Sequence, residues 1–139
     1  MPPPRPRILC TEDDLDTREM ITIILTDDGF EVTCAESPIE AIELAMSSPY
    51  DLILVDNWMP GLSGADLTET IRQFDTKTPI LFYSGAAYEK DKEAARLAGA
   101  QGYLVKPTSC DELTAEVTRI IAESKIAYPI AVAMTASSI

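Results

Sequence analysis

The feature that most constrains the fold of this sequence is a short apolar run, residues 52–55, that ends directly on Asp56. The run is too short for a stable helix and lacks the alternation of a half-exposed strand, so it predicts a strand covered on both faces. Pro60, Gly61 and Gly64 follow and predict a loop. In parallel sheets such loops leave the carboxyl ends of strands, where ligands bind. Asp56 is therefore either a turn cap or a functional carboxylate, and the other segments decide between the two.

Strand-like and helix-like segments alternate along the rest of the chain. The segment at 30–34 alternates apolar and polar residues, which indicates a strand at the edge of the sheet. The expected strands are 8–11, 30–34, 52–55, 78–83 and 102–105. The expected helices start at or just after residues 15, 37, 63, 88 and 108.

Capping residues and apolar spacing define the helices further. Ser37 and Glu40 form a capping box with a proline at the first helical position. Ser63 with Asp66 predicts a second cap of this kind, and either Thr108 or Ser109 predicts a third. The residues expected on the buried faces are Ile21, Ile24 and Leu25; Ile39, Ile42 and Met46; Leu67, Ile71 and Phe74; and Leu113, Val117, Ile120 and Ile121.

Five strands alternating with five helices predict an α/β fold, a three-layer doubly wound parallel sheet with right-handed crossovers. A length of 139 residues suits one domain. We expect a proline-rich N-terminal arm at 1–6, the domain at 7–124, and a C-terminal extension at 125–139 with no output domain. The extension is too short and too interrupted to span a bilayer. Packing on the body, pairing between subunits and disorder remain open for it.

Charge and cysteine content exclude several function classes. The net charge of −12 disfavours nucleic acid and anionic membranes as partners. Cys10, Cys34 and Cys110 are odd in number, and the chain has no histidine to complete a zinc site, so reduced and mostly buried thiols are expected. The N-terminus lacks the apolar core of a signal peptide, which favours a cytoplasmic location.

Chemically distinctive residues follow four of the expected strands. Because parallel strands place their carboxyl ends at one edge, Glu12, Asp13, Asp56, Ser84 and Lys106 are expected to share one pocket. Clustered carboxylates repel one another, and a hard divalent cation such as magnesium relieves that repulsion. A lysine and a serine hydroxyl can then hold the remaining oxygens of a phosphoryl group.

The order of these residues resembles the receiver domain of two-component response regulators over about residues 7–124. The residues that carry the resemblance are Glu12-Asp13, Asp56 with Met59-Pro60 and Gly64, Ser84, and Lys106-Pro107. The resemblance implies a flavodoxin-like fold with strand order 2-1-3-4-5.

The resemblance also assigns roles at the acidic site. It implies that Asp56 is the phosphoacceptor and that Asp13 binds Mg²⁺, with Glu12 acting partly through water. The backbone carbonyl of Trp58 would complete the protein ligands. Asp14 lies one place beyond the acidic pair and is left out of the metal site.

Further roles follow for the last two strands. Ser84 and Lys106 would bind the phosphoryl group, Tyr103 would be the aromatic switch residue, and Lys106-Pro107 would be a cis peptide. Thr108 departs from the family pattern by replacing an apolar residue, and Asn57 does the same after the phosphoacceptor. Neither departure removes a catalytic group.

Trp58 and Ala86 stand two residues after Asp56 and Ser84, on either side of the expected line of attack by water. Neither side chain can orient a water molecule through an amide or a carboxylate. The sequence therefore predicts slower self-dephosphorylation than in a receiver with polar residues at both positions.

The function implied is a phosphorylation-dependent signalling switch. A histidine kinase or a phosphotransfer protein would donate the phosphoryl group, and a downstream protein target, not named by the sequence, would read the changed surface. The chain would not be an enzyme, but a phosphoacceptor that assists its own phosphorylation and dephosphorylation. The alternative is a receiver-like binding module that works without phosphorylation. An aspartate-based phosphatase would need a second acid where Trp58 stands.

Oligomeric state is left open, including a homodimer. Residues 100–102 lack the acidic pair that transcription-factor receivers commonly carry there for dimerising through their last helices. That mode of dimerisation is therefore not expected.

Overall fold

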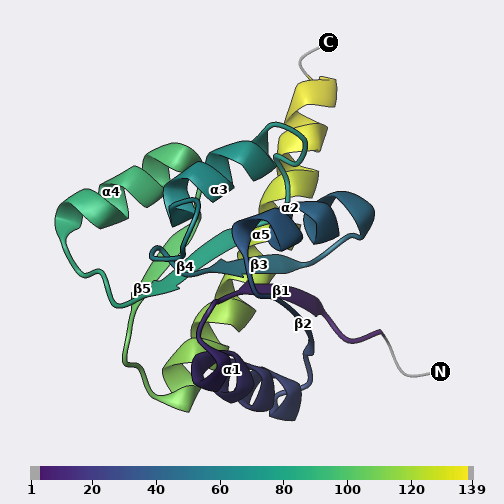
Figure 1. The fold of residues 1–139 in the computed structure, drawn as a ribbon. Coiled ribbons are helices and arrows are strands. Elements are labelled where there is room, and N and C mark those ends of the chain that lie inside the picture. The colour runs from purple at the N-terminus through teal and green to yellow at the C-terminus, as the bar shows by residue number, and fades with distance from the viewer. Residues whose placement is uncertain (1–3, 138–139) are drawn as a thin grey trace.

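The fold is a parallel sheet between two layers of helices (Figure 1), as described by a computed structural model. The structure describes residues 4–137, with side chains up to residue 126. The strands are β1 (Arg7–Thr11), β2 (Glu31–Ala35), β3 (Leu52–Val55), β4 (Ile80–Ser84) and β5 (Gly102–Val105). The helices are α1 (Leu15–Asp27), α2 (Pro38–Ser47), α3 (Gly64–Arg72), α4 (Glu89–Ala98) and α5 (Cys110–Ser137).

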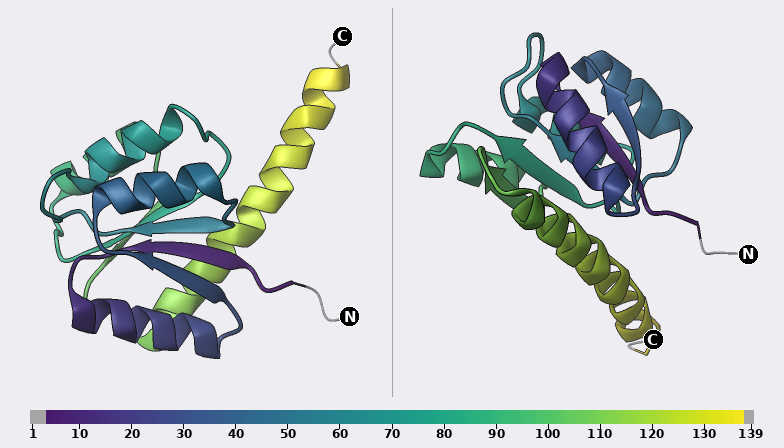
Figure 2. Two further views of the ribbon diagram at one scale, coloured as in Figure 1. Left: turned by 45° about the vertical axis from the view of Figure 1, so that its right-hand side comes forward. Right: turned by 90° about the horizontal axis from the view of Figure 1, so that it is seen from below.

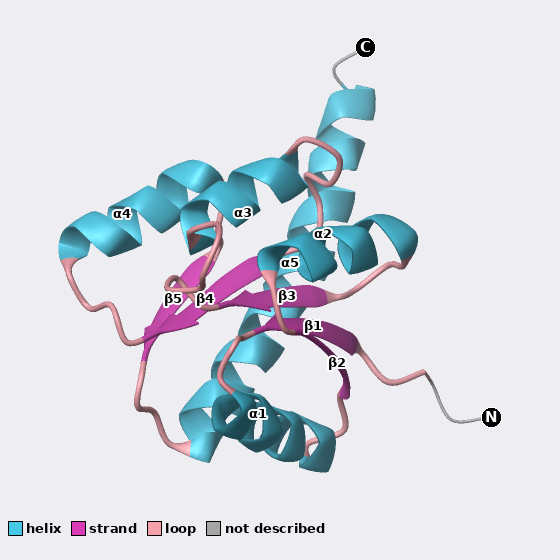
Figure 3. Ribbon diagram, in the orientation of Figure 1, coloured by secondary structure: helices cyan, strands magenta, loops and turns pink. Residues whose placement is uncertain are grey.

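All neighbouring strands pair in parallel, in the order β2-β1-β3-β4-β5. Helices α1 and α5 cover one face of the sheet, and α2, α3 and α4 cover the other (Figure 3). This arrangement confirms the expected doubly wound α/β fold and the strand order 2-1-3-4-5. The order places β1 and β3 side by side in the centre, so the loops after these strands meet at the topological switch point.

Two apolar cores fill the spaces between the layers. Successive side chains of each strand point to opposite faces, so Ile8 and Cys10 of β1 enter the core under α1 and α5, while Leu9 enters the other core. The strands β3 and β4 are buried along their whole length. Burial on both faces explains their continuous apolar sequence.

The N-terminal caps agree with the sequence and decide one alternative. The Ser37 hydroxyl accepts from the Glu40 amide at 3.2 Å, and the Ser63 hydroxyl accepts from the Asp66 amide at 3.1 Å. In α5 the cap is Ser109, whose hydroxyl accepts from the amide of residue 112 at 3.1 Å.

The expected apolar stripe of α2 is wrong for two of its three residues, whereas Ile42 does pack against the core. Ile39 and Met46 are exposed, whereas Pro38 and Ala41 are the buried residues of this helix. The small Ala41 side chain lets α2 lie close to the sheet. Phe74 was likewise expected inside and is 41% exposed, because it follows the end of α3.

Helix α5 continues well past Ser124, where the sequence placed the end of the domain. Its backbone is helical to Ser137, and its C-terminal half projects beyond the sheet (Figure 2). In the part of the chain that the structure describes, no helix has the length and apolar character needed to cross a bilayer.

Candidate functional site

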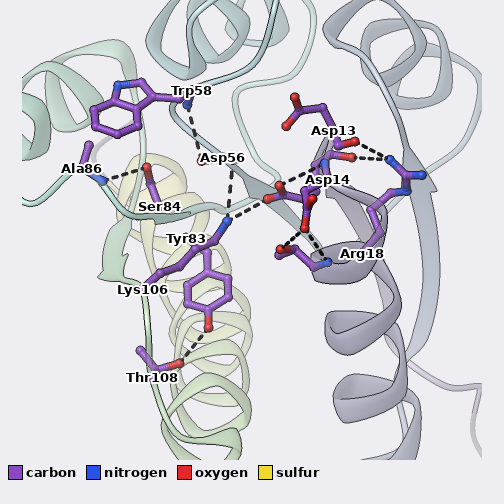
Figure 4. A network of polar contacts seen from close by, with 12 residues as sticks. Asp13, Asp14, Arg18, Asp56, Trp58, Tyr83, Ser84, Ala86, Lys106 and Thr108 are labelled. Carbon is purple, nitrogen blue, oxygen red and sulfur yellow. Dashed lines mark hydrogen bonds and ion pairs between the residues drawn. The ribbon is translucent and has the colours of Figure 1, made fainter.

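The carboxyl ends of β1, β3, β4 and β5 bring the sequence-predicted residues together at one edge of the sheet (Figure 4). Carboxylate oxygens of Glu12, Asp13 and Asp56 all lie within 4.8 Å of one another. Glu12 and Asp56 are 3% and 8% exposed, whereas the Asp13 side chain is exposed. The site is therefore a largely buried acidic pair with a third carboxylate at its solvent side.

Backbone hydrogen bonds fix the two buried carboxylates. The Glu12 amide donates to the Ala35 carbonyl at 3.2 Å, and the Asp56 amide donates to the Thr11 carbonyl at 3.2 Å. Both bonds extend the strand ladders by one residue beyond β1 and β3. The central sheet thus sets the position of these carboxylates.

Asp14 is the N-cap of α1 and is not part of the carboxylate cluster. Its carboxylate caps α1 by accepting from the Thr17 amide at 2.9 Å and from the Thr17 hydroxyl at 2.6 Å. These bonds lower the pKa of Asp14. Capping at Asp14 places the acidic cluster at Glu12 and Asp13, immediately before the helix.

Arg18 supports the loop that carries the acidic pair, and the sequence reasoning did not find it. Its guanidinium donates to the carbonyl oxygens of Glu12 and Asp13, both at 3.0 Å, and lies 3.6 Å from the Glu36 carboxylate. The position of Arg18 relative to the helix cap could have indicated this role. Arg18 stands four residues after the helix cap and so lies one turn along α1, above the same loop.

Lys106 supplies the internal positive charge. Its ammonium donates to Glu12 Oε2 at 2.9 Å and lies 3.8 Å from Asp56 Oδ2. It also lies 5.4 Å from the centre of the Tyr83 ring, a cation–π contact that the sequence reasoning missed. The Tyr83 hydroxyl is within 3.0 Å of the Thr108 hydroxyl, which anchors the ring beneath the lysine.

Burial and charge shift the pKa values of this pair. Burial raises the pKa of Glu12, and the neighbouring Asp56 carboxylate adds to the effect, although Lys106 opposes it. Burial works against the Lys106 ammonium, but its bond with Glu12 and the charge of Asp56 outweigh burial and raise the pKa of Lys106. The cluster therefore still contains unrelieved repulsion between carboxylates.

Burial of Glu12, together with repulsion from Asp56, predicts a stability that falls as the pH rises. The pKa of Glu12 is 4.5 in the unfolded protein and higher in the folded protein. Between these two pKa values the folded protein retains a proton on Glu12 that the unfolded protein has released. The stability that this proton contributes is fully present below pH 4.5 and is lost as the pH rises through the pKa of Glu12 in the folded protein. Relative to wild type, Glu12→Gln should therefore become more stable as the pH is raised from 4.5 to 7, measured by urea unfolding at each pH. Glu43→Gln, on the exposed face of α2, controls for removal of a carboxylate; an equal change in both variants would contradict the prediction.

A second set of contacts joins β4 to β5. The Ser84 hydroxyl is fully buried and accepts from the Ala86 amide at 3.2 Å. The Tyr103 hydroxyl donates to the Ala86 carbonyl at 2.7 Å, and its ring stacks on Phe82 with the ring centres 5.5 Å apart. Burial raises the pKa of Tyr103. The backbone of one residue, Ala86, therefore links the two hydroxyl groups.

The loop after β3 borders the site. The Trp58 amide donates to Asp56 Oδ1 at 3.4 Å, while the Trp58 indole is 64% exposed. A Cβ on Gly64 would come within 2.7 Å of the Phe82 ring and 2.9 Å of the Asn57 backbone, so only glycine fits where α3 begins. The peptide between Lys106 and the following proline is cis, which confirms that expectation.

The donor set fits a hard divalent cation. Three carboxylates converge from two neighbouring strand ends, and oxygen is the ligand that Mg²⁺ prefers. Lys106 bonds one face of the cluster, whereas the exposed Asp13 leaves the opposite side accessible to solvent.

Comparisons with known proteins agree with this geometry. The sequence profile described as "Response regulator receiver domain" matches residues 8–118. The cell cycle transcriptional regulator CtrA of Caulobacter vibrioides is 34% identical over 119 residues, which cover 86% of this chain and 52% of that protein. The cell cycle response regulator CtrA of Brucella ovis is 37% identical over the same length. The chain thus spans about half the length of the curated relatives it matches.

Solved structures show the same fold. The receiver domain of the sensor histidine kinase PA1611 from Pseudomonas aeruginosa, solved with a magnesium ion coordinated in its active site cleft, is 32% identical with a TM-score of 0.79, and the match covers 85% of this chain and 98% of that one. The receiver domain of the Francisella response regulator 1452 gives 29% identity and a TM-score of 0.81, over 86% and 99% of the two chains. With the profile match and the convergent acidic site, these similarities show that the chain belongs to the response regulator receiver domain family of two-component systems.

Proposed function

We propose that this chain is a phosphorylation switch that accepts a phosphoryl group on Asp56 from a histidine kinase or a phosphotransfer protein. The observation that carries the proposal is the convergence of the carboxylates of Glu12, Asp13 and Asp56, with the Lys106 ammonium against the first and the last of them. A downstream protein would read the phosphorylated surface. The chain spans about half the length of its CtrA relatives, so the target is not inferred from the activities of those whole proteins.

Asp56 is the nucleophile in this proposal. One of its carboxylate oxygens attacks the phosphorus of the donor, the bond between phosphorus and the donor nitrogen or oxygen breaks, and an aspartyl phosphate forms. Asp13, Asp56 and the Trp58 carbonyl would hold Mg²⁺, with Glu12 acting partly through water. When bound, the ion would neutralise negative charge on the phosphoryl oxygens.

Lys106 can exchange its bond to Glu12 for one to the phosphoryl group during this reaction. Its ammonium is bonded to Glu12 and lies 3.8 Å from Asp56, so a small movement brings it to a phosphoryl oxygen on Asp56. A charge-assisted hydrogen bond of this kind holds the phosphoryl group without rearranging the sheet.

The contacts of Ala86 support a route for the signal. A phosphoryl group on Asp56 would draw the Ser84 hydroxyl toward it, and Ser84 is bonded to the Ala86 amide. The carbonyl of Ala86 accepts from Tyr103, so movement of this backbone shifts the aromatic ring on β5. The change in surface is therefore expected around α4 and β5.

The test is direct. Incubation with Mg²⁺ and acetyl phosphate should add one phosphoryl group, detected by intact-mass measurement and removed by alkali or by hydroxylamine. Omitting Mg²⁺ is the control and should prevent labelling. A protein that folds, binds Mg²⁺ and gains no label would favour the phosphorylation-independent binding module.

Trp58 is expected to slow hydrolysis of the aspartyl phosphate. Ala86, which was expected to flank the line of attack, is only 1% exposed, so its side chain faces the interior. Of these two residues, only Trp58 is exposed to solvent. We expect Trp58→Asn to shorten the phosphoryl lifetime about tenfold, equivalent to about 1.4 kcal/mol in the barrier, because an amide can orient the attacking water. Decay of the labelled mass measures this; Trp58→Phe is the control, and equal decay in both variants would exclude the explanation.

A further inference from the structure

Two cysteines lie next to each other outside the acidic site. Cys10 of β1 and Cys34 of β2 are register partners in the parallel sheet. Neighbouring strands are about 4.8 Å apart, and disulfides join Cα atoms about 4.4–6.8 Å apart. Both side chains belong to the core covered by α1 and α5, so they point to the same face of the sheet. All three cysteines are free.

The two thiols differ in access to solvent. Cys10 is 1% exposed, whereas Cys34, on the edge strand, is half-buried. Cys110 is exposed at the start of α5, so the expectation of mostly buried thiols holds fully only for Cys10. A shallow groove of about 320 Å³ reaches Cys34; it is lined by Leu15, Arg18, Glu19, Thr22, Ile23 and Cys34.

The surroundings of Cys34 stabilise a thiolate. Its sulfur lies 3.3 Å from the Thr22 hydroxyl, whose single proton can go to this sulfur or to the Arg18 carbonyl, 2.8 Å away. The hydrogen bond with Cys10 is the largest cause that lowers the pKa of Cys34 to about 6; the Thr22 bond and the charge of Arg18 also lower it, against burial. Thiolates, rather than thiols, react with oxidants and electrophiles.

We propose that Cys34 is an oxidant-reactive thiol and that Cys10 is its resolving partner, so that a small hydroperoxide converts the pair into a disulfide between β1 and β2. In the first step the Cys34 sulfur attacks the distal oxygen of hydrogen peroxide, the O–O bond breaks, and hydroxide leaves with the electron pair. In the second step the Cys10 sulfur displaces the sulfenic hydroxyl group. The S–S bond forms, the Cys10 proton leaves with the hydroxyl as water, and the cysteines together have lost two electrons to the peroxide.

Such a bond would lie close to the acidic site. Cys10 is two residues before Glu12. The Glu12 amide donates a hydrogen bond to the carbonyl of Ala35, the residue after Cys34. Side chains on neighbouring strands are farther apart than the Cβ atoms of a relaxed disulfide, so the two strands must shift to form it. Strain makes a disulfide more reducible, and dithiothreitol should therefore reverse the reaction readily.

The test uses the full chain with Cys110→Ser, which removes the exposed thiol but leaves the pair. Treatment with hydrogen peroxide should give a monomer that has lost one hydrogen from each thiol, with residues 10 and 34 linked in the peptide map. Addition of Cys10→Ala should stop at a sulfenic acid on Cys34 that dimedone traps. Addition of Cys34→Ser should abolish both products while Cys10 stays reduced.

Two outcomes would overturn the proposal. One is oxidation of Cys10 in the Cys34→Ser variant at the rate of the intact pair, which would mean that Cys34 is not the reactive thiol. The other is failure of the folded Cys110→Ser protein to form the intramolecular bond under peroxide. Far-UV circular dichroism of each variant shows that the protein tested is folded.

Discussion

Asp56→Asn is expected to gain no phosphoryl group from acetyl phosphate under conditions in which the wild-type protein gains one. The asparagine amide is nearly the same size as the carboxylate, so it can keep the contact with the Trp58 amide. It is uncharged and far less nucleophilic, and it cannot form an acyl phosphate. The loss should therefore be complete and not partial, because position 56 then carries no carboxylate oxygen that can attack the donor. Intact-mass measurement of both proteins, with matched Mg²⁺ and time, checks this.

A matched substitution at the other end of the same strand serves as control. Asp51 immediately precedes β3, and its carboxylate accepts from the Arg7 amide at 2.7 Å. Asparagine can accept the same bond, so Asp51→Asn should fold and should be labelled as well as wild type. Label retained in Asp56→Asn would mean that another side chain is the acceptor. Label lost in Asp51→Asn would mean that the reaction depends on general integrity of β3.

The sheet could be predicted from the sequence because most of its strands are apolar runs that are too short to form a stable helix. The strand order then follows from the resemblance, and the meeting of Glu12, Asp56 and Lys106 follows from the shared edge of parallel strands. Backbone direction places all of these residues at one edge of the sheet, and the long Lys106 side chain reaches Glu12 from β5. The prediction therefore needed no knowledge of individual side-chain contacts.

Side-chain contacts made across elements could not be predicted in the same way. The hydrogen bonds of Arg18 to the acidic loop and the position of the Tyr83 ring under Lys106 depend on how α1 and β4 pack against their neighbours. The predicted buried face of α2 was wrong at Ile39 and Met46, because the small residue Ala41 is the one buried against the sheet. Spacing favours large apolar residues as the buried face, but close helix packing favours small ones.

Repulsion in the acidic cluster predicts that Mg²⁺ stabilises the folded protein and that Asp13 controls this response. Only the folded chain assembles Glu12, Asp13 and Asp56 within 4.8 Å of one another, so the ion binds the folded state in preference to the unfolded state. At a free Mg²⁺ concentration of one hundred times its Kd, the gain is about 2.7 kcal/mol. Thermal unfolding across a Mg²⁺ titration, with EDTA as the reference, measures the gain.

Asp13→Asn should lose much of the response to Mg²⁺ and Asp14→Asn should keep it, although each removes one negative charge and the two positions are adjacent. Asp13 contributes a carboxylate oxygen to the cluster, so its loss should weaken Mg²⁺ binding at least tenfold and remove about 1.4 kcal/mol or more of the stabilisation at a fixed low Mg²⁺ concentration. Asp14 instead caps α1 through Thr17, and asparagine caps helices about as well as aspartate. Asp14→Asn should therefore keep both its fold and nearly all of its response to the ion. If Asp14→Asn lost the response and Asp13→Asn kept it, the metal site would be one residue further along the chain than the carboxylate geometry indicates. If the two variants lost it equally, the effect of Mg²⁺ would reflect general screening of a chain with a net charge of −12.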